Sequence, residues 1–207
     1  MRRLIFILLA IAAAPLMAAE PDLLARIGAQ AERHAVVRAE FVQQKQMAAL
    51  KRPLVTSGHV VFSHRDGVLW QIESPYRAGY ALGENSVVEI AGDGTRRERN
   101  LRDVPGLAQV ATIFRAMLGA NEKALRETFD VDARGDVERW QIELKPRQEQ
   151  LARFVSRFSL AGGRFVESIR IEEAGGDTTL IRFRNTQAGE AASAAELVAF
   201  GKANPKP

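Results

Sequence analysis

The chain has 207 residues, of which 46% are hydrophobic and 26% are charged, a composition typical of globular proteins and unlike that of disordered or fibrous ones. Cysteine is absent, which excludes disulfide scaffolds, thiol catalysis and cysteine-based metal sites. The formal net charge is +4, and without Arg2 and Arg3 the chain carries 27 basic against 25 acidic residues, so the charge balance predicts no nucleic-acid partner.

The N-terminus has the pattern of an export signal. Two arginines precede an apolar run over residues 4–16, and small residues follow up to Ala19, which is the order found in secretory signal peptides. The alternative is an uncleaved membrane anchor, but Pro15 interrupts a run that is shorter than the roughly 20 residues of a spanning helix. We therefore expect residues 1–19 to be a cleaved signal peptide and residues 20–207 to form one exported domain.

The first half of the remaining chain predicts one helix followed by strands. Apolar residues recur at helical spacing over residues 22–34, and Asp22 can cap the start of that helix. The pattern then changes to a period of two, which is typical of strands. The predicted strands span residues 37–44, 55–63, 68–73, 76–82 and 86–90. Asp66-Gly67 and Asp93-Gly94 are turn sequences between them, and the first resembles a two-residue hairpin turn.

The second half predicts another helix and then more strands. Five apolar residues from Leu107 to Leu118 lie on one helical face. After it, alternating apolar residues begin at Trp140, and two glycine turns join three successive strands into an antiparallel meander. We count about ten strands and no βαβ alternation. The predicted fold is mainly β (α+β), a single curved or barrel-like antiparallel sheet with two or three helices packed on it.

Catalytic motifs are absent from the sequence. The three histidines, at positions 34, 59 and 64, belong to no metal-binding or nucleophile motif, and no phosphate-binding loop occurs. The densest basic cluster, residues 95–102, is interpreted as a solvated hairpin, with a contact to phosphate or lipid headgroups as the alternative. We predict that the protein is not an enzyme and that it has no catalytic residue, metal ion or cofactor.

The aromatic residues in the strand patterns allow two interpretations. A curved sheet with helices on its inner face can hold a filled core, or it can leave an apolar cavity between sheet and helix. The residues themselves favour the filled core as the default and do not exclude the cavity.

Several short motifs occur in the order found in one known family. Residues 39–43 contain a Phe-x-Gln strand after the first helix, and Arg65, Trp70 and Pro75 have the spacing Arg-x4-Trp-x4-Pro. Residues 194–200 are similar to the Ala-Ala-x-Phe-x-Phe ending of that family. With these motifs, the chain resembles the periplasmic outer-membrane lipoprotein carriers, the LolA-like proteins, as a divergent branch.

The resemblance implies an incomplete antiparallel β-barrel covered by helices that form a lid over an apolar cavity. It implies a monomeric periplasmic carrier that holds the acyl chains of a lipoprotein, or of another lipidated cargo such as a glycolipid, and shuttles it from the inner to the outer membrane. An inner-membrane exporter and an outer-membrane acceptor would be its partners. The residues expected to line the cavity are Phe41, Phe62, Val68, Trp70, Ile72, Tyr80, Val110, Phe114, Leu118 and Trp140.

Arg65 corresponds to the arginine that latches the lid in the family. The guanidinium offers five donors to the carbonyl groups at the end of a lid helix. The family usually has proline after this arginine, whereas this chain has Asp66, so a solvated turn arginine is the alternative. Two other classes stay open at this stage: a periplasmic binding or envelope-assembly protein with a solid core and no lipid cargo, and an enzyme that acts on envelope lipids.

Overall fold

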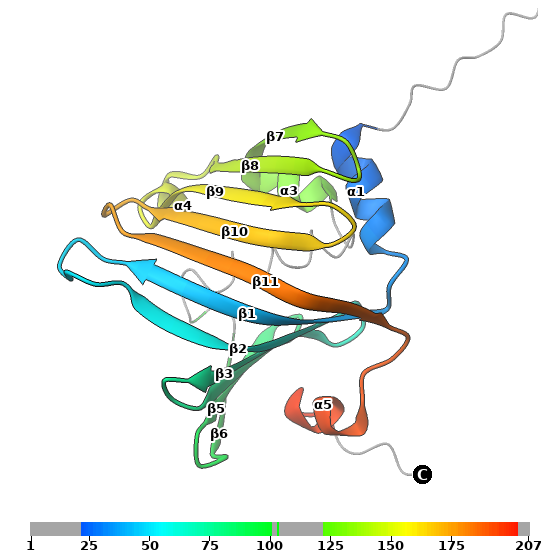
Figure 1. Ribbon diagram of the computed structural model, residues 1–207, viewed down its shortest axis with the longest axis vertical. Coiled ribbons are helices and arrows are strands. Elements are labelled where there is room, and N and C mark those ends of the chain that lie inside the picture. Colours follow the sequence, from blue (N-terminus) through cyan, green and yellow to red (C-terminus); the bar gives the residue numbers. More distant parts are fainter. Residues whose placement is uncertain (1–21, 101–102, 104–121, 203–207) are drawn as a thin grey trace, which may run out of the picture.

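The computed structural model describes residues 22–100, 103 and 122–202, and Figure 1 shows most of them in one curved antiparallel sheet. Its strands are β1 (Val36–Gln46), β2 (Leu54–Ser63), β3 (Gly67–Ser74), β4 (Ala78–Leu82), β5 (Ser86–Ala91), β6 (Arg96–Asn100), β7 (Phe129–Gly135), β8 (Trp140–Pro146), β9 (Val155–Gly162), β10 (Val166–Glu173) and β11 (Thr178–Gly189). The spatial order is β6-β5-β4-β3-β2-β1-β11-β10-β9-β8-β7. The sheet therefore consists of two meanders joined where β1 pairs with β11.

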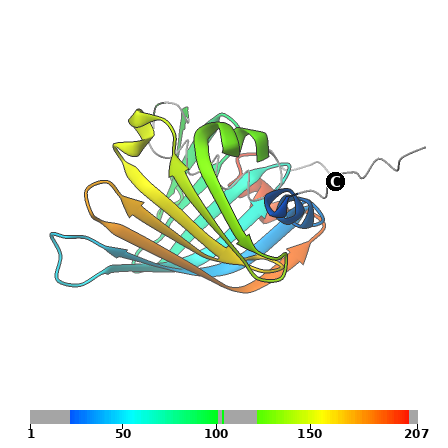
Figure 2. The same cartoon turned by 90° about the horizontal axis from the view of Figure 1, so that it is seen from above.

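This architecture confirms the expected fold class. The eleven described strands exceed the predicted number by one, and β6 and β7 form the two ends of a sheet that does not close into a barrel. Figure 2 shows how the sheet curls so that its two halves face each other across a concave side. The expected incomplete barrel is thus present as an open, strongly curved sheet.

The described residues form four helices beside the sheet: α1 (Leu23–Ala31), α3 (Glu122–Thr128), α4 (Glu149–Ala152) and α5 (Ala194–Ala199). The start of α1 is capped as predicted, because Asp22 Oδ1 accepts a hydrogen bond from the Ala25 backbone N–H at 2.9 Å. The helix predicted over Leu107–Leu118 lies outside the described residues. None of the helices in the described ranges combines the length and apolar character needed to cross a membrane.

Alternation along the strands produces two different faces. Side chains on the concave face, with α1 and α3, form the inner core, which contains Leu24, Ile27, Phe41, Val60, Phe62, Val68, Ile72, Leu125, Phe129, Trp140, Ile142, Leu144, Phe158, Leu160, Ile169, Ile181 and Phe183, among others. Side chains one position along the strands form the smaller outer cluster on the convex face of β1–β5, with Val36, Val61, Leu69, Ala81, Val88 and Phe200. Phe200 follows α5, so the C-terminal segment covers apolar strand residues that would otherwise face water.

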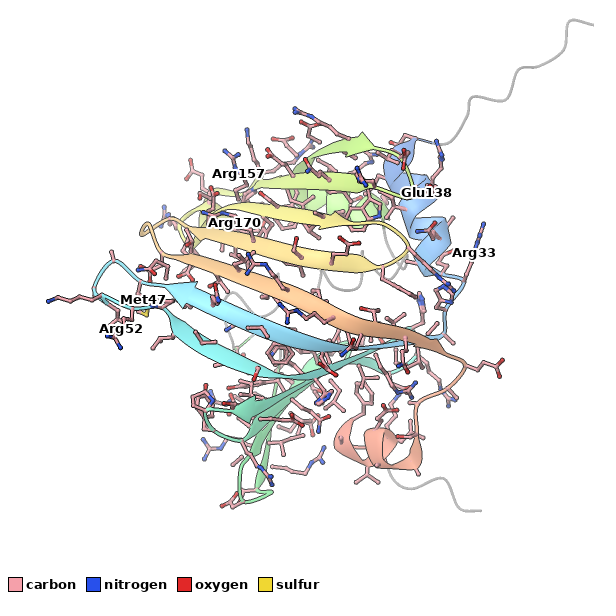
Figure 3. The ribbon with its side chains drawn as sticks, in the orientation of Figure 1. Arg33, Met47, Arg52, Glu138, Arg157 and Arg170 are labelled. Atoms are coloured by element: carbon pink, nitrogen blue, oxygen red, sulfur yellow. The ribbon has the colours of Figure 1, made fainter. Side chains whose placement is uncertain are left out.

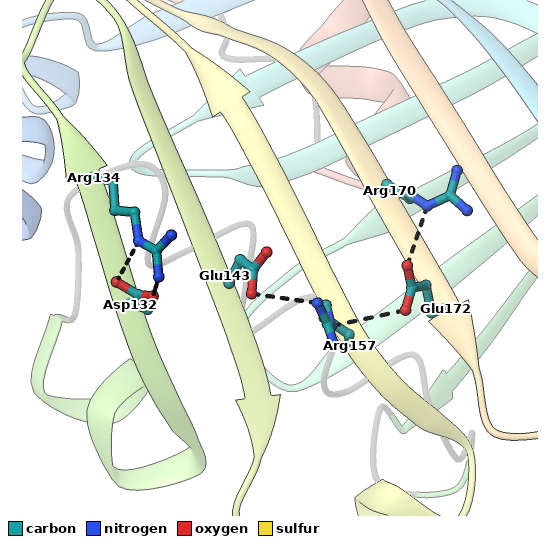
Figure 4. Close-up of polar contacts among 6 residues, drawn as sticks. All are labelled: Asp132, Arg134, Glu143, Arg157, Arg170 and Glu172. Carbon is teal, nitrogen blue, oxygen red and sulfur yellow. Dashed lines mark hydrogen bonds and ion pairs between the residues drawn. The ribbon is translucent and has the colours of Figure 1, made fainter.

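The convex face of the other half of the sheet is charged. Figure 4 shows Arg157 on β9 between Glu143 on β8 and Glu172 on β10, at 3.4 and 3.8 Å, and Arg170 at 3.3 Å from Glu172. On β7, Arg134 pairs with Asp132 at 2.6 Å. These pairs are at least a third exposed, so each adds little to stability. Their effect is to keep this half of the convex face solvated.

Polar contacts fix α5 on the outer cluster. Arg38 on β1 donates to both carboxylate oxygens of Glu196 at 2.6 Å. This hydrogen bond, opposed by partial burial, lowers the pKa of Glu196 below its usual value. Ser193 and Glu196 also form a capping box at the helix start. A second arginine, Arg96 on β6, donates to the Ala199 carbonyl at 2.5 Å.

The loop between β2 and β3 differs in one detail from the predicted two-residue turn. Ser63 pairs with Gly67 across the hairpin, which leaves a loop of three residues, 64–66. The side chain of Asp66 is only 4% exposed and accepts hydrogen bonds from Ser63 Oγ at 2.8 Å and from Lys202 Nζ at 2.5 Å. Burial alone would raise the pKa of Asp66, but these bonds outweigh it and hold the pKa below its usual value. Asp66 is thus a buried residue of the loop that contacts the C-terminal segment.

Candidate functional site: an apolar cavity under α1

A cavity of about 210 Å³ lies between α1 and the concave face of the sheet. Its apolar lining comes from α1, α3 and strands of both meanders: Leu24, Ile27, Val37, Ala39, Phe62, Leu125, Trp140, Ile142, Leu144, Leu160 and Phe183. The alternation of β8 explains why three of these belong to one strand, since Trp140, Ile142 and Leu144 all point to the concave side. The site is therefore a hydrophobic pocket roofed by a helix.

Hydrogen bonds fix α1 over the cavity near the C-terminal end of the helix. Gln30 Nε2 on α1 donates to the Gly163 carbonyl at 2.9 Å and to the Val137 carbonyl at 3.3 Å. Trp140 Nε1 donates to the same Gly163 carbonyl at 2.8 Å. Because its N–H is satisfied, the Trp140 indole can line an apolar cavity without an unpaired polar atom. At the other end of α1, Asp22 forms an ion pair with Arg126 of α3.

Polar and exposed side chains mark where the cavity meets solvent. Glu32, His34 and Arg164 belong to the lining, and Glu32 and Arg164 are exposed. The Arg164 guanidinium lies 5.3 Å from the centre of the Phe165 ring, and the His34 ring lies 5.4 Å from the same ring. The cavity thus has an apolar interior, with the Arg164 guanidinium and the His34 imidazole at its opening.

The chemistry of the cavity is that of a binding site. An apolar cavity of about 150 Å³ binds benzene, and pockets for whole drug-sized ligands measure about 300–1,000 Å³. The described cavity, about 210 Å³, therefore has the volume for part of a hydrocarbon chain. Within the described ranges, no three His, Asp or Glu side chains gather as metal ligands.

The structure distributes the predicted cavity residues over two regions. Phe62 and Trp140 line the cavity. The others that the structure describes lie in or against the inner core and outside the lining: Phe41, Val68, Trp70, Ile72 and Tyr80. Val110, Phe114 and Leu118, from the predicted lid helix, lie outside the described residues.

The predicted residues outside the lining include Phe41 and Trp70, which pack next to the aromatic side chains that line the cavity. The rings of Phe41 and Trp70 lie 3.9 Å apart, and Phe183 contacts Trp70 and Phe62 edge-on at 6.3 and 6.1 Å. Burial, with smaller effects of Tyr76 and Glu89, raises the pKa of Tyr80, so its hydroxyl remains neutral.

Arg65 lies exposed in the loop between β2 and β3. Among the described residues, its guanidinium has no hydrogen bond or ion pair, and the neighbouring Asp66 carries the contacts instead. The lid helix that it would latch lies outside the described residues, so the latch role stays a prediction.

Sequence reasoning missed most of the lining. The predicted set contains no residue of α1 and only Trp140 from the second meander, although two signals pointed to the others. The apolar face of the first helix, with Leu24 and Ile27, had to cover some part of the sheet, and the alternation after Trp140 defined a second inward face. What the sequence did not show is which strands lie opposite this helix, because that depends on the β1–β11 pairing.

The chain is similar to known proteins both in sequence and in structure. A family model described as outer membrane lipoprotein carrier protein LolA-like matches residues 13–203, whereas no curated protein matches the sequence. Among solved structures, the chain is similar to a DUF1329 family protein from Desulfovibrio piger, with 12% identity, a TM-score of 0.49 and coverage of 83% of this chain and 93% of that one. It is also similar to a LolA superfamily protein from Nitrosomonas europaea, with 8% identity, a TM-score of 0.48 and coverage of 86% and 97%.

A third similar structure is the MucA/MucB complex from Pseudomonas aeruginosa, with 12% identity, a TM-score of 0.46 and coverage of 84% of this chain and 59% of that one. The family match extends over most of the chain, including both meanders and α5. The chain therefore belongs to the LolA-like outer membrane lipoprotein carrier family.

Proposed function

We propose that the protein is a periplasmic carrier that holds the acyl chains of a lipidated cargo in the cavity under α1 and moves that cargo from the inner to the outer membrane. The observation that carries the proposal is the apolar cavity of about 210 Å³ between a helix and the concave face of an open sheet. Membership of the LolA-like carrier family supports it. Lipoproteins and glycolipids are the two cargo classes, because both present long acyl chains.

The energetic argument concerns hydrocarbon in water. Each buried methylene group contributes about 0.8 kcal/mol, so a chain of which several methylenes enter the cavity binds with useful affinity. A cavity that holds part of a chain also permits release, since the remaining methylenes stay available to an acceptor. The Arg164 side chain at the opening can meet a polar or anionic group next to the chain.

A cavity-filling variant tests the proposal. Ala39 lines the cavity, and Ala39→Phe adds a phenyl ring, a group for which about 150 Å³ suffices. We expect the purified wild-type protein to bind a fluorescent fatty-acyl probe, with energy transfer from Trp140, and to lose it on addition of a lipopeptide. Ala39→Phe should lower the probe affinity at least about ten-fold, since two buried methylenes alone account for about 1.6 kcal/mol.

The matched control is Ala195→Phe, which adds the same ring at an exposed position of α5. It should bind the probe like the wild type. Thermal unfolding of both variants verifies that they are folded. If folded wild-type protein does not bind the probe, or if Ala39→Phe binds it with unchanged affinity, the cavity under α1 is not the acyl site.

A further inference from the structure

Exposed apolar side chains gather at one end of the sheet. Of the six large hydrophobic residues that are exposed in the described ranges, five lie in or beside the loops at this end: Leu50, Leu54, Val55, Tyr76 and Phe154. Antiparallel pairing places these loops together, because the connections β1–β2, β3–β4, β8–β9 and β10–β11 all leave the sheet on the same side. We call this the hairpin end. The sixth residue, Val198, lies on α5, which follows β11 at the opposite end.

Two hydrogen bonds tie three of these loops into one unit. The Ala48 backbone N–H in the β1–β2 loop donates to Asp177 Oδ1 in the β10–β11 loop at 3.0 Å. The Ala174 backbone N–H in that second loop donates to the Phe154 carbonyl at 3.0 Å. Leu50 is held in a turn as well, since its N–H donates to the Met47 carbonyl at 3.0 Å. The apolar side chains are therefore presented by a fixed backbone.

The same end carries cations without acidic partners. Lys51, Arg52, Arg77 and Arg153 are exposed, and none of them has an ion pair with another described residue. Three acidic groups at this end are engaged, because Glu173 pairs with Lys45 at 2.6 Å, Asp130 pairs with Arg147 at 2.8 Å and Asp177 accepts the Ala48 N–H. Glu149 on α4 is exposed, so the cations at this end outnumber the unpaired carboxylates. In Figure 3, Met47 and Arg52 lie at the β1–β2 hairpin, at the opposite end of the sheet from Arg33.

We propose that the hairpin end docks on the surface of an anionic phospholipid bilayer. Apolar side chains next to free lysines and arginines are the combination that binds a membrane interface, where the hydrocarbon enters the headgroup–acyl boundary and the cations meet lipid phosphates. Leu50 and Leu54 would enter that boundary, and Lys51 and Arg52 between them would remain at the phosphates. Tyr76 fits the same depth, since its ring is apolar and its hydroxyl is polar.

This surface differs from the convex face of β7–β10. There, Arg134, Arg157 and Arg170 each have a carboxylate partner, so approaching lipid phosphates would have to compete with existing pairs. Exposed apolar residues of large size are absent from the described part of that face. The hairpin end combines both features, and the cavity opening at Arg164 lies at the other end of the sheet, next to the β9–β10 turn.

Co-sedimentation with vesicles tests the proposal without any cargo. We expect the wild-type protein to bind vesicles of mixed phosphatidylcholine and phosphatidylglycerol, and to bind phosphatidylcholine vesicles much less. Lys51→Glu/Arg52→Glu should weaken binding to the mixed vesicles at least about 25-fold, which corresponds to about 1 kcal/mol for each basic residue. Leu50→Ser should weaken it several-fold while keeping the salt dependence.

The matched controls carry the same changes elsewhere. Arg33→Glu/Arg139→Glu reverses two exposed charges at the opposite end of the sheet, and Val198→Ser removes an exposed apolar side chain from α5. Both should bind vesicles like the wild type. Equal losses in the controls, or wild-type protein that stays in the supernatant with both kinds of vesicle, would overturn the proposal. The hairpin variants should bind the fatty-acyl probe normally, which separates this result from the test of the cavity.

Discussion

The contact between Lys202 and Asp66 provides a sharp test of how the C-terminal segment is held. Lys202 follows α5, and its ammonium lies 2.5 Å from an Asp66 oxygen in the β2–β3 loop. The two side chains are unequally exposed, 45% for Lys202 and 4% for Asp66. Lys202→Met keeps the aliphatic stem and removes the cation, so the Asp66 carboxylate remains buried with a single hydrogen bond, the one it accepts from Ser63 Oγ.

The expected loss of stability follows from that imbalance. A hydrogen bond to a charged group contributes about 1.5–3 kcal/mol, and the larger penalties of fully buried pairs do not apply because water reaches the Lys202 ammonium. For a chain of this size, we expect the melting temperature to fall by about 3–12 °C. Lys45→Met is the matched control, since its partner Glu173 also lies at 2.6 Å but is 31% exposed. That variant should lose less than about 1 kcal/mol.

The difference between wild type and Lys202→Met should depend on pH. In the wild type the pKa of Asp66 is lowered, so its contribution is fully present above the pKa of the unfolded chain and is lost as the pH falls through the folded value. Without Lys202, burial is opposed only by the Ser63 hydrogen bond and the charge of Arg65, so we expect the pKa of Asp66 to be higher than in the wild type, and the protonated group needs no cation. The two proteins should therefore differ most at neutral pH and converge below the ordinary carboxyl pKa.

Urea unfolding, followed by tryptophan fluorescence over a range of pH values, measures this difference directly. The reasoning fails if Lys202→Met and Lys45→Met lose the same free energy at neutral pH. It also fails if the gap between Lys202→Met and wild type stays constant into the acidic range.

Three further predictions concern single positions. Phe200→Ala should lower the free energy of unfolding by up to about 3–5 kcal/mol, because the Phe200 side chain is part of the outer cluster. Hydrogen exchange should increase first in β2–β5. An unchanged urea unfolding curve would contradict this prediction. Gly67→Ala should lower the free energy of unfolding by about 1–3 kcal/mol, since Gly67 has φ +107 and an added Cβ would lie 2.0 Å from the Leu82 carbonyl oxygen. Gly94 also has a positive φ, but a Cβ added there would meet no neighbouring atom. The difference in unfolding free energy between Gly67→Ala and Gly94→Ala therefore measures the collision apart from the backbone strain. Arg65→Leu should have a free energy of unfolding within about 0.5 kcal/mol of the wild-type value, because Arg65 is exposed. If the variant transfers cargo to an acceptor membrane at a different rate, Arg65 is a latch. If the rate is unchanged, Arg65 is only a turn residue.

The sequence predicted the sheet well because its signals are local. The alternation at Val37, Ala39 and Phe41, and again after Trp140, defines inward faces without knowledge of the partner strands. The prediction missed β7, where acidic and basic residues alternate with Val131 and Ala133, since small or sparse apolar residues give a weak period. It also missed α5 as a helix, although Ser193 and Glu196 form a capping box that could have revealed it.

The cavity was less predictable because it depends on contacts between distant segments. Its walls come from α1, β1 and β8, and more than a hundred residues separate α1 from β8 in the sequence. No local sequence pattern specifies which strands the apolar face of a helix covers. Likewise, Asp66 was interpreted as a turn residue, yet its partner Lys202 lies 136 positions away. Long-range pairing of this kind follows from packing of the whole chain rather than from any window of it.

Because the sheet has two open edges, the width of its concave side is not fixed by strand pairing. In a closed barrel, strand number and shear fix the diameter, whereas here β6 and β7 end the sheet and, within the described residues, pair with no further strand. A change in curvature can move these two edges apart without breaking any strand pair, so, if the proposed carrier function is correct, we expect one scaffold to accept acyl chains that differ in number and thickness. The exposed edge strand β6 is almost entirely charged, from Arg96 to Arg99, and such an edge resists pairing with a second molecule.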